Sequence, residues 1–330
     1  MASISNGFWS RAISEVMRAH EPEATAPSGL PRVAVLLAAY EGMSWIEEQL
    51  ASILAQTGVR VTIYISVDPS SDGTEAWCAD YALTHSQVVL LPSSGPFRGA
   101  SRNFFRLIRD VEFSEYDYVA FSDQDDIWYC DKLVRAVSTL HTARVDGYSS
   151  NVRAIWPDGR RILVDKAQPQ VEWDFLFEAA GPGCTYVLTQ RLACAFKHLI
   201  SRAWTDVQSI DLHDWFCYAF ARSQGFKWFI DPLPGMDYRQ HASNQVGVNS
   251  GFRSAIARWR KIADGWWFRQ ICLTAMILKV SNPYTGGASA AAAALSTVRV
   301  ARDVRKCRRR PRDRVVLLVV CLLQTVAGRR

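Results

Sequence analysis

Residues 33–40 form an unbroken apolar run, Val-Ala-Val-Leu-Leu-Ala-Ala-Tyr. A run without the alternation of a half-exposed strand is typical of a parallel strand that is buried on both faces. Similar runs recur at 61–67, 88–91 and 118–122, and helical patterns lie between them, at 44–56, 74–84 and 99–109. Ser44 and Glu47 have the spacing of a capping box, which predicts that the first helix begins there. The alternation predicts an α/β fold with a doubly wound, mainly parallel sheet flanked by helices.

Ligands of such sheets gather at the carboxyl ends of the strands. Three polar loops follow strands in this sequence, at 40–42, 68–74 and 123–126, and we expect them to converge. The first strand is not followed by Gly-x-Gly-x-x-Gly, and the chain has no Gly-x-x-x-x-Gly-Lys-Ser/Thr. Both a dinucleotide-dependent dehydrogenase and a P-loop NTPase are therefore disfavoured.

The third loop, Ser-Asp-Gln-Asp-Asp-Ile-Trp at 122–128, carries carboxylates at 123, 125 and 126. Three carboxylates so close together repel one another unless a cation lies among them. Mn²⁺ or Mg²⁺ is the expected cation, since both prefer oxygen ligands and are commonly shared with substrate phosphates. The alternative is an acidic turn before a helix at 132–140, with Asp131 as its N-cap.

The second half of the chain has a different pattern. A hairpin is expected over 152–164, a short strand at 186–188, helices at 191–203 and from about 211 to 223, a strand at 226–230 and a polar loop at 237–244. From Phe252 the chain is predicted to be helical, rich in Trp and finally basic. We therefore expect a loosely ordered leader at 1–30, a main domain at 31–250 and a helical extension at 251–330.

The net charge of +6 comes largely from the extension, where nine basic residues lie between Arg299 and Arg314. The eight cysteines lack zinc or redox spacing, which suits a reducing compartment. Residues 1–26 do not have the pattern of a signal peptide, and the longest apolar run, 315–323, is shorter than the about 20 residues that a membrane span needs.

The order of these motifs resembles the inverting glycosyltransferases of family 2, which have the GT-A (Rossmann-like) fold, and in particular their bacterial rhamnosyltransferase-like members. The resemblance covers about residues 32–250. It rests on the segments 37–42, 49–57, 66–74, 122–128 and 213–215, on 238–241, and on Asn244 and Gly247.

The resemblance implies a role for each matching residue. Asp214 would be the general base, and Asp125 and His241 would hold the metal. The donor would contact Ala39, Tyr40, Glu41, Asp68, Arg98, Asn103, Asp123 and Gln124. The acceptor side would be formed by Gly183, Cys184, Thr185, His213 and Trp215. One departure concerns the donor, because Val67-Asp68-Pro69-Ser70 stands where the family commonly has Asp-Asp-Gly-Ser.

Each role has a simpler alternative. Asp211 or Asp214 can merely cap the helix that follows, His241 can be a surface residue, and Gly183 can be an ordinary turn into a strand. At the level of the whole protein, one alternative is a nucleotidyltransferase, which would need a basic phosphate-binding loop where this chain has Glu41-Gly42-Met43. The other is a non-catalytic scaffold recruited to membranes, which the presence of Asp123, Asp125 and Asp214 argues against.

The implied reaction is transfer of a sugar, with rhamnose as the candidate, from a dTDP- or UDP-linked donor to a saccharide or lipid-linked acceptor in cell-surface polysaccharide synthesis. Mn²⁺ or Mg²⁺ is the expected cofactor. The Trp residues at 259, 266 and 267 lie among basic residues, so this segment is expected either to lie in a membrane interface or to pack on the main domain. The basic cluster and the run at 315–323 favour a cytoplasmic protein that is peripheral on the inner face of the membrane. A nucleic-acid partner is not expected, and the sequence leaves the oligomeric state open.

Overall fold

The computed structural model describes residues 29–241, 265–285 and 295–327. The expected leader therefore lies almost wholly outside the described residues. The same holds for Asn244, Gly247, Trp259 and the start of the expected C-terminal helix.

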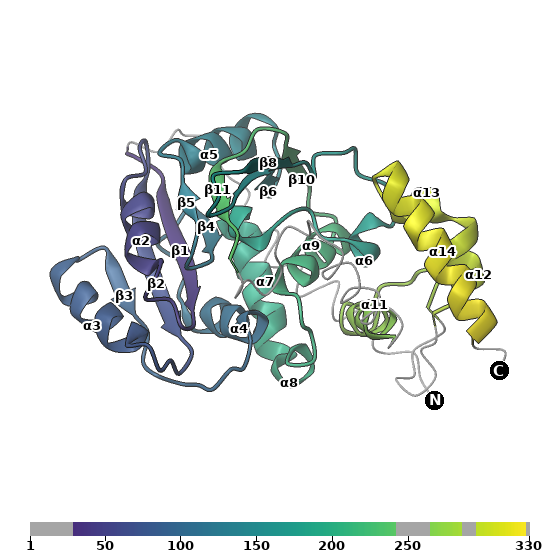
Figure 1. The fold of residues 1–330 in the computed structure, drawn as a ribbon, viewed down its shortest axis with the longest axis horizontal. Coiled ribbons are helices and arrows are strands. Elements are labelled where there is room, and N and C mark those ends of the chain that lie inside the picture. The colour runs from purple at the N-terminus through teal and green to yellow at the C-terminus, as the bar shows by residue number, and fades with distance from the viewer. Residues whose placement is uncertain (1–28, 242–264, 286–294, 328–330) are drawn as a thin grey trace.

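A seven-stranded sheet forms the centre of the molecule (Figure 1). Its order is β10 (Trp228–Asp231), β6 (Gly147–Ser150), β9 (Val187–Thr189), β4 (Tyr118–Ser122), β1 (Arg32–Ala39), β2 (Arg60–Val67) and β3 (Val88–Leu90). All neighbouring pairs are parallel except the two made by β9, which is antiparallel to β4 and β6. The predicted mainly parallel sheet is confirmed.

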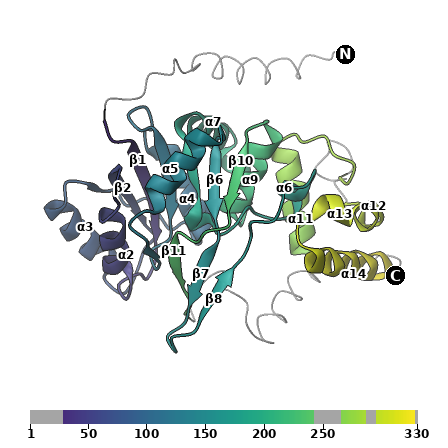
Figure 2. The ribbon, with the colours of Figure 1, turned by 90° about the horizontal axis from the view of Figure 1, so that it is seen from above.

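Helices cover both faces of this sheet (Figure 2). One face packs against α4 (Ala100–Asp110), α7 (Gln190–Arg202) and α9 (His213–Ser223), and the other against α2 (Ile46–Leu54), α3 (Thr74–Thr84) and α5 (Lys132–Thr142). Ala34 and Leu36 of β1 enter the first core, whereas Val35 and Leu37 enter the second. Successive side chains of a strand point to opposite faces, so a strand buried on both faces must be apolar throughout.

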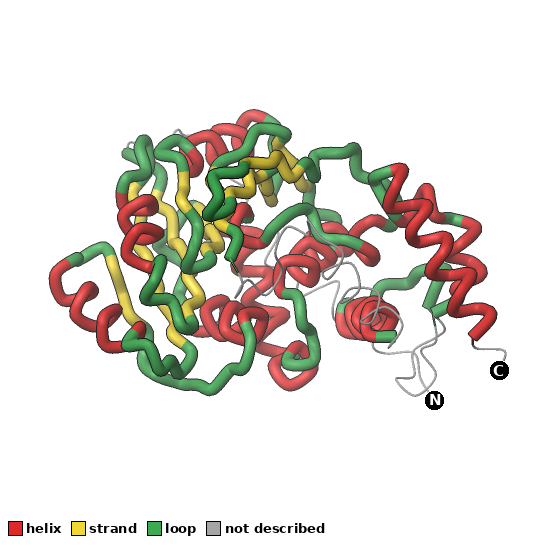
Figure 3. The backbone as a smooth tube through the Cα atoms, viewed as in Figure 1, coloured by secondary structure: helices red, strands yellow, loops and turns green. Residues whose placement is uncertain are grey.

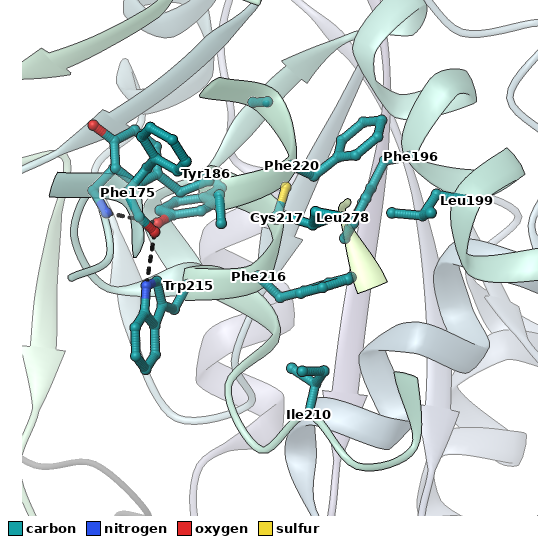
Figure 4. Close-up of a cluster of buried hydrophobic side chains, with 14 of the residues drawn as sticks. Phe175, Tyr186, Phe196, Leu199, Ile210, Trp215, Phe216, Cys217, Phe220 and Leu278 are labelled. Atoms are coloured by element: carbon teal, nitrogen blue, oxygen red, sulfur yellow. Dashed lines mark hydrogen bonds between the residues drawn. The ribbon is translucent and has the colours of Figure 1, made fainter. Parts of the chain in front are cut away.

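The first core is dominated by aromatic residues of α9 and its neighbours (Figure 4). Trp215 is buried there, and its indole Nε1–H donates to the carbonyl oxygen of Phe175 at 2.9 Å. Tyr186 is also buried, and its hydroxyl accepts the backbone N–H of Ala180 at 3.1 Å. Both polar groups are thus satisfied inside an apolar cluster, which is the usual condition for burying Trp and Tyr.

A second, four-stranded sheet has the order β5 (Ile127–Trp128), β11 (Met236–Arg239), β7 (Val152–Ile155) and β8 (Arg161–Val164). The hairpin predicted over 152–164 is present as β7 and β8. The prediction of a loop from Asp237 was wrong over its first three residues, which belong to β11. Met236 and Tyr238 are buried between two partner strands, so tertiary pairing outweighs the polar composition of this segment.

The start of α2 also differs from the prediction. The helix begins at Ile46, its N-cap is Trp45, and no side chain caps it, so Ser44 and Glu47 do not form a capping box. Instead the backbone N–H groups of Trp45 and Ile46 donate to the carbonyl oxygen of Gly42 at 2.9 and 3.0 Å. A turn in the first polar loop therefore starts the helix.

The C-terminal extension contains α11 (Trp266–Ile277), α12 (Thr297–Arg302), α13 (Val304–Cys307) and α14 (Pro311–Ala327), without strands of the two sheets (Figure 3). Arg309 attaches it to α6 (Asp174–Phe177), since its buried guanidinium pairs with Asp174 at 2.9 Å and with Glu178 at 3.5 Å. Asp174 also accepts hydrogen bonds from Tyr218 and Arg222 of α9. One buried ion network thus joins the extension, α6 and α9.

Replacing Arg309 with Ala should destabilise the protein strongly, because it leaves the buried carboxylate of Asp174 with one cation fewer. Breaking a buried pair from one side costs about 3–5 kcal/mol of unfolding free energy. Thermal unfolding followed by circular dichroism measures this. Arg305→Ala is the control, since Arg305 is exposed and its loss should cost less than about 0.5 kcal/mol. Equal melting temperatures for the two variants would contradict the account.

Candidate active site

The register of the sheet places the three polar loops at one edge. β1 lies between β2 and β4 and is parallel to both, with Ala39 opposite Val67 and Leu37 opposite Ser122. The three strands therefore end close together, and Tyr40, Asp68 and Asp123 follow directly. The predicted convergence at the carboxyl edge is observed.

Gln124 joins the first and third loops. Its Oε1 accepts the backbone N–H of Tyr40 at 2.7 Å, and its Nε2–H donates to the carbonyl oxygen of Tyr40 at 2.7 Å. Gly42 allows this close approach, since a Cβ there would lie 2.5 Å from Gln124 Oε1. Gln124 thus links the first and third loops with both ends of its amide, while the Tyr40 side chain is 54% exposed beside it.

Glu41 joins the first and second loops. Its Oε1 accepts the backbone N–H of Ser71 at 2.7 Å and the hydroxyl of Ser71 at 3.0 Å, and its own N–H donates to Ser70 Oγ at 3.0 Å. Glu41 has a φ of 48°, so the chain turns sharply after Ala39, the last residue of β1. The first loop is therefore fixed to both of its neighbours.

The other expected donor residues lie around the second loop. Asp68 is buried, and its two carboxylate oxygens accept the backbone N–H groups of Phe97 and Arg98 at 2.7 and 2.8 Å. The Arg98 side chain is exposed. Asn103 is buried in α4, where its Nδ2–H donates to the carbonyl oxygen of Ser66 at 2.9 Å. Asp68 thus fixes the backbone at Phe97 and Arg98, and Asn103 ties α4 to the end of β2.

The acids of the third loop meet a thiol from η1 (Gly183–Thr185). Ligand atoms of Asp123, Asp126 and Cys184 all lie within 4.8 Å of one another. Burial, together with the charges of Asp125 and Asp214, raises the pKa of Asp123 to about 7. Burial and the charges of Asp125 and Asp123 also raise the pKa of Asp126 well above its usual value. The cluster is thus short of positive charge.

Asp125 points to a different partner. Its Oδ2 lies 2.8 Å from His241 Nε2, and the imidazole stacks on the indole of Trp45 with ring centroids 5.3 Å apart. Arg239 lies 4.6 Å from the Trp45 ring centroid, and its Nε–H donates to the carbonyl oxygen of Asp125 at 3.0 Å. The two expected metal ligands, which are 116 positions apart in the sequence, are therefore adjacent in the fold.

Asp214 lies in the first turn of α9, and its Oδ1 accepts the backbone N–H of Trp215 at 2.7 Å. Burial raises the pKa of Asp214 to about 6, although backbone N–H groups, including that of Gly183, partly oppose the rise. The carboxylate is close enough to Asp123 for its charge to raise the pKa of Asp123. At neutral pH a group with this pKa is mostly ionised and able to accept a proton.

The remaining residues expected on the acceptor side are interior. Cys184 and Thr185 are fully buried, and His213 and Trp215 nearly so. Burial lowers the pKa of His213 to about 3, so the ring is neutral, and it stacks on Phe104 at 3.9 Å between centroids. A Cβ on Gly183 would lie 2.8 Å from His213 Nε2. These residues are therefore part of the buried packing around Asp214, and their side chains are not exposed to solvent.

Comparison with known proteins identifies the chain. The model of a family described as "Glycosyltransferase like family 2" matches residues 31–161. The chain is 42% identical over 292 residues to the dTDP-rhamnosyl transferase RfbG of Shigella flexneri, covering 87% of this chain and 99% of that protein. The chain belongs to glycosyltransferase family 2.

More distant relatives agree with this membership. The UDP-Glc:alpha-D-GlcNAc-diphosphoundecaprenol beta-1,3-glucosyltransferase WfaP of Escherichia coli is 24% identical over 214 residues, which cover 64% of this chain and 78% of that protein. The crystal structure of S. aureus TarS 1-349 in complex with UDP-GlcNAc superposes with a TM-score of 0.51 at 12% identity, covering 76% of this chain and 68% of that chain. The predicted GT-A fold and glycosyltransferase activity are confirmed.

The family 2 site has donor atoms that suit a divalent cation. Carboxylate oxygens and a neutral imidazole are the ligands that Mn²⁺ accepts, and Mg²⁺ takes the oxygens. The buried Oδ2 of Asp126 has no hydrogen-bond partner among the described residues, which is costly unless something positive or protonated compensates. The carboxylates of Asp123 and Asp126, with the adjacent Asp125 and His241, therefore offer donor atoms that fit the implied ion.

Sequence reasoning missed two residues of the glycosyltransferase site. Trp45 carries no motif, and only the fold shows that it supports His241. Lys132 was read as the first residue of a helix, yet its Nζ is buried 3.3 Å from the Trp128 ring centroid, and burial lowers its pKa to about 7. The charges of Cys184 and Asp126 partly oppose this fall, so Lys132 is a buried amine close to the acidic cluster whose charged form is disfavoured by burial.

Asp123→Asn should stabilise the metal-free enzyme at high pH. The pKa of Asp123 rises from 3.8 to about 7 on folding, so the folded state binds more protons between these values, and ionisation of Asp123 opposes folding most fully above about pH 7. The variant should therefore melt at a higher temperature than the parent at about pH 8. The difference should shrink towards zero near pH 4.

Differential scanning calorimetry in chelator across this pH range checks the prediction. Asp80→Asn is the matched control, since Asp80 is exposed in α3 and its replacement should not change the pH dependence. A lower melting temperature for Asp123→Asn at high pH would show that the ionised carboxylate stabilises the fold.

Proposed function

We propose that this glycosyltransferase moves rhamnose, with inversion, from a dTDP-linked donor to a saccharide or lipid-linked acceptor of cell-surface polysaccharide synthesis, and that it depends on a divalent cation. The donor and sugar are suggested by the 42% identity to a dTDP-rhamnosyl transferase along nearly its whole length. The observation that carries the proposal is the gathering of Asp123 and Asp125, from the loop after β4, and Asp214, from α9, into one acidic cluster.

Asp214 is the proposed general base. In an inverting transfer the acceptor hydroxyl attacks the anomeric carbon as the bond to the leaving diphosphate breaks, and a carboxylate takes the hydroxyl proton. The first turn of α9 favours the ionised carboxylate through the backbone N–H of Trp215 and the helix dipole. The acceptor would approach the carboxylate of Asp214, which Gly183 contacts closely because it has no Cβ.

Asp125 and His241 would hold Mn²⁺ or Mg²⁺, and Asp123 would face the donor. The bound ion supplies positive charge that screens the leaving nucleoside diphosphate. Arg239 donates a hydrogen bond to the backbone of Asp125 and packs on Trp45, and Trp45 stacks on His241. These contacts would orient both proposed ligands. The donor base would lie near Asp68, which acts through the loop that it holds at Phe97 and Arg98.

The rival functions are less well supported. Membership of a glycosyltransferase family leaves no reason to infer a nucleotidyltransferase, and the first loop carries Glu41 rather than a basic phosphate-binding residue. A non-catalytic scaffold would gain nothing from buried acids whose mutual repulsion opposes folding. Buried carboxylates with strongly raised pKa values are typical of functional sites.

Asp214→Asn should abolish transfer while leaving donor binding intact, since the amide keeps the shape of the side chain but cannot take a proton. A general base is typically worth about 10²- to 10⁴-fold in rate. Released dTDP, measured with acceptor present, reports transfer, and isothermal titration with dTDP and Mn²⁺ reports binding. Asp206→Asn, at an exposed carboxylate, is the control. A rate equal to that of the control would mean that another group is the base.

Binding of dTDP should require both the cation and the Asp125–His241 pair. We expect dTDP with Mn²⁺ to raise the melting temperature of the parent, and chelator, Asp125→Ala or His241→Ala to remove most of this rise. In the same assay dTDP-rhamnose should stabilise more than UDP-glucose or GDP-mannose. A rise that is unchanged in chelator would exclude the metal site, and equal stabilisation by all donors would exclude the preference.

A lipid-linked acceptor places the reaction at a membrane, and we propose that the enzyme is peripheral on its inner face. Among the described residues there is no helix that is both long and apolar enough to span a bilayer. Attachment would therefore depend on the surface of the molecule.

A further inference from the structure

Two parts of the C-terminal extension could contact a membrane, the Trp-rich segment and the last helix. The described part of the Trp-rich segment is used internally. Trp267 is 9% exposed, packs on Phe177 and lies under the guanidinium of Arg308 at 5.1 Å. The indole Nε1–H of Trp266 donates to a carboxylate oxygen of Asp211. These two aromatic residues attach α11 to the main domain and are not offered to solvent as a face.

α14 has the opposite character. Leu317, Val320 and Cys321 are buried against the rest of the extension. The outer side chains are Val315, Val316, Val319, Leu322 and Leu323, which are 61, 48, 40, 55 and 56% exposed. Spacings of three, four, seven and eight place them on one face of a helix. α14 lies at the edge of the molecule far from β3 (Figures 1 and 2). The exposed fractions show that its apolar face is not covered by the described residues.

Exposed basic side chains lie at the start of α14 and on the neighbouring α12 and α13. Arg312 lies three and four residues before Val315 and Val316, on the same side of the helix, and its side chain is 77% exposed. Arg302 and Arg305 of the neighbouring α12 and α13 are exposed and form no ion pair with a described carboxylate. Between 295 and 327 the acids are Asp303 and Asp313, against nine basic residues, of which Lys306, Arg308, Arg309, Arg310 and Arg312 pair with carboxylates. An apolar stripe with a basic border is the pattern of a helix that lies in an anionic membrane interface.

A second copy of the chain fits this face less well. Five aliphatic side chains on one helix offer less than the roughly 800 Å² per partner of a stable interface. A symmetric pairing of the two stripes would also bring the basic borders of both copies together. Acidic headgroups supply the complementary charge, and their acyl chains supply the apolar surroundings.

We propose that the exposed face of α14, formed by Val315, Val316, Val319, Leu322 and Leu323 with Arg312, binds anionic phospholipid. This rests on the proposed membrane association and assigns it to one surface. The ion pairs of Arg309 with Asp174 and Glu178 hold the start of α14 against α6. α6 ends at Phe177, six residues before Gly183 on the proposed acceptor side. Docking of α14 would therefore hold the acceptor side of the site at a fixed position relative to the lipid.

Co-sedimentation of the full-length enzyme with vesicles tests the assignment. We expect binding to phosphatidylcholine vesicles that contain phosphatidylglycerol and much weaker binding to phosphatidylcholine alone. The double variant Val319→Gln, Leu322→Gln should bind on the order of tenfold or more weakly, since it removes two inserting side chains. Arg312→Gln should weaken binding about fivefold. Leu83→Gln, at an 86% exposed leucine of α3, is the matched control and should bind like the parent.

The possible failures are distinguishable. If the parent binds neither vesicle, membrane association itself is wrong, whereas transfer to a soluble acceptor still tests the glycosyltransferase. If the parent binds and the double variant, folded by circular dichroism, binds equally well, lipid contact is elsewhere. If the double variant instead converts a dimer into a monomer in light scattering without losing vesicle binding, the occupant of the face is a second copy, and the proposal is overturned.

Discussion

The structure of the site depends on the burial of carboxylates that the fold brings close together. Parallel pairing of β1 with β2 and β4 ends three strands at one edge, and η1 and α9 close over it, so that Asp123, Asp126 and Asp214 share a poorly solvated space. Burial raises the pKa of all three, and the charges of neighbouring carboxylates add to the rise at Asp123 and Asp126. A cation offsets this unfavourable burial of charge, and a ligand that carries its own negative charge can bind there only together with that cation. The proposed metal dependence and diphosphate binding would thus have one electrostatic origin.

The surroundings of the cluster are rigid because its polar groups are shared between loops. Both ends of the Gln124 amide form hydrogen bonds with the backbone of Tyr40, and the Glu41 carboxylate accepts one from Ser71. The Asp68 carboxylate accepts the backbone N–H groups of Phe97 and Arg98. Several of the residues that the family resemblance assigned to donor contact therefore also organise the backbone that makes the contact. A second network lies around Asp174, which contacts Tyr218 and Arg222 of α9 and Arg309 of the C-terminal extension. The helix that carries Asp214 and the extension are therefore joined through one buried carboxylate.

Much of the fold was predictable because its strands are buried on both faces. The apolar runs that form β1, β2 and β4 have the length of strands and not of helices, and their predicted boundaries were correct to within a residue. The errors fall where tertiary contacts outweigh local signals. β11 is a polar segment that pairs with two strands, and α2 begins at a turn on Gly42 instead of at a capping Ser44.

For the site, the sequence by itself determined which carboxylates exist and which ones follow a strand, and the strand order then brings these to one edge. It also gave the motifs that mark the family. Only the tertiary structure decided that His241 reaches Asp125, that Trp45 supports it, and that Lys132 is buried below Asp126. The same holds for the outer face of α14, whose exposure depends on what α11, α12 and α13 leave uncovered. The physical reason is that a short stretch of sequence is enough to indicate a buried strand, because its apolar pattern is local. Charge pairing and surface exposure depend instead on distances between residues that are far apart in the chain.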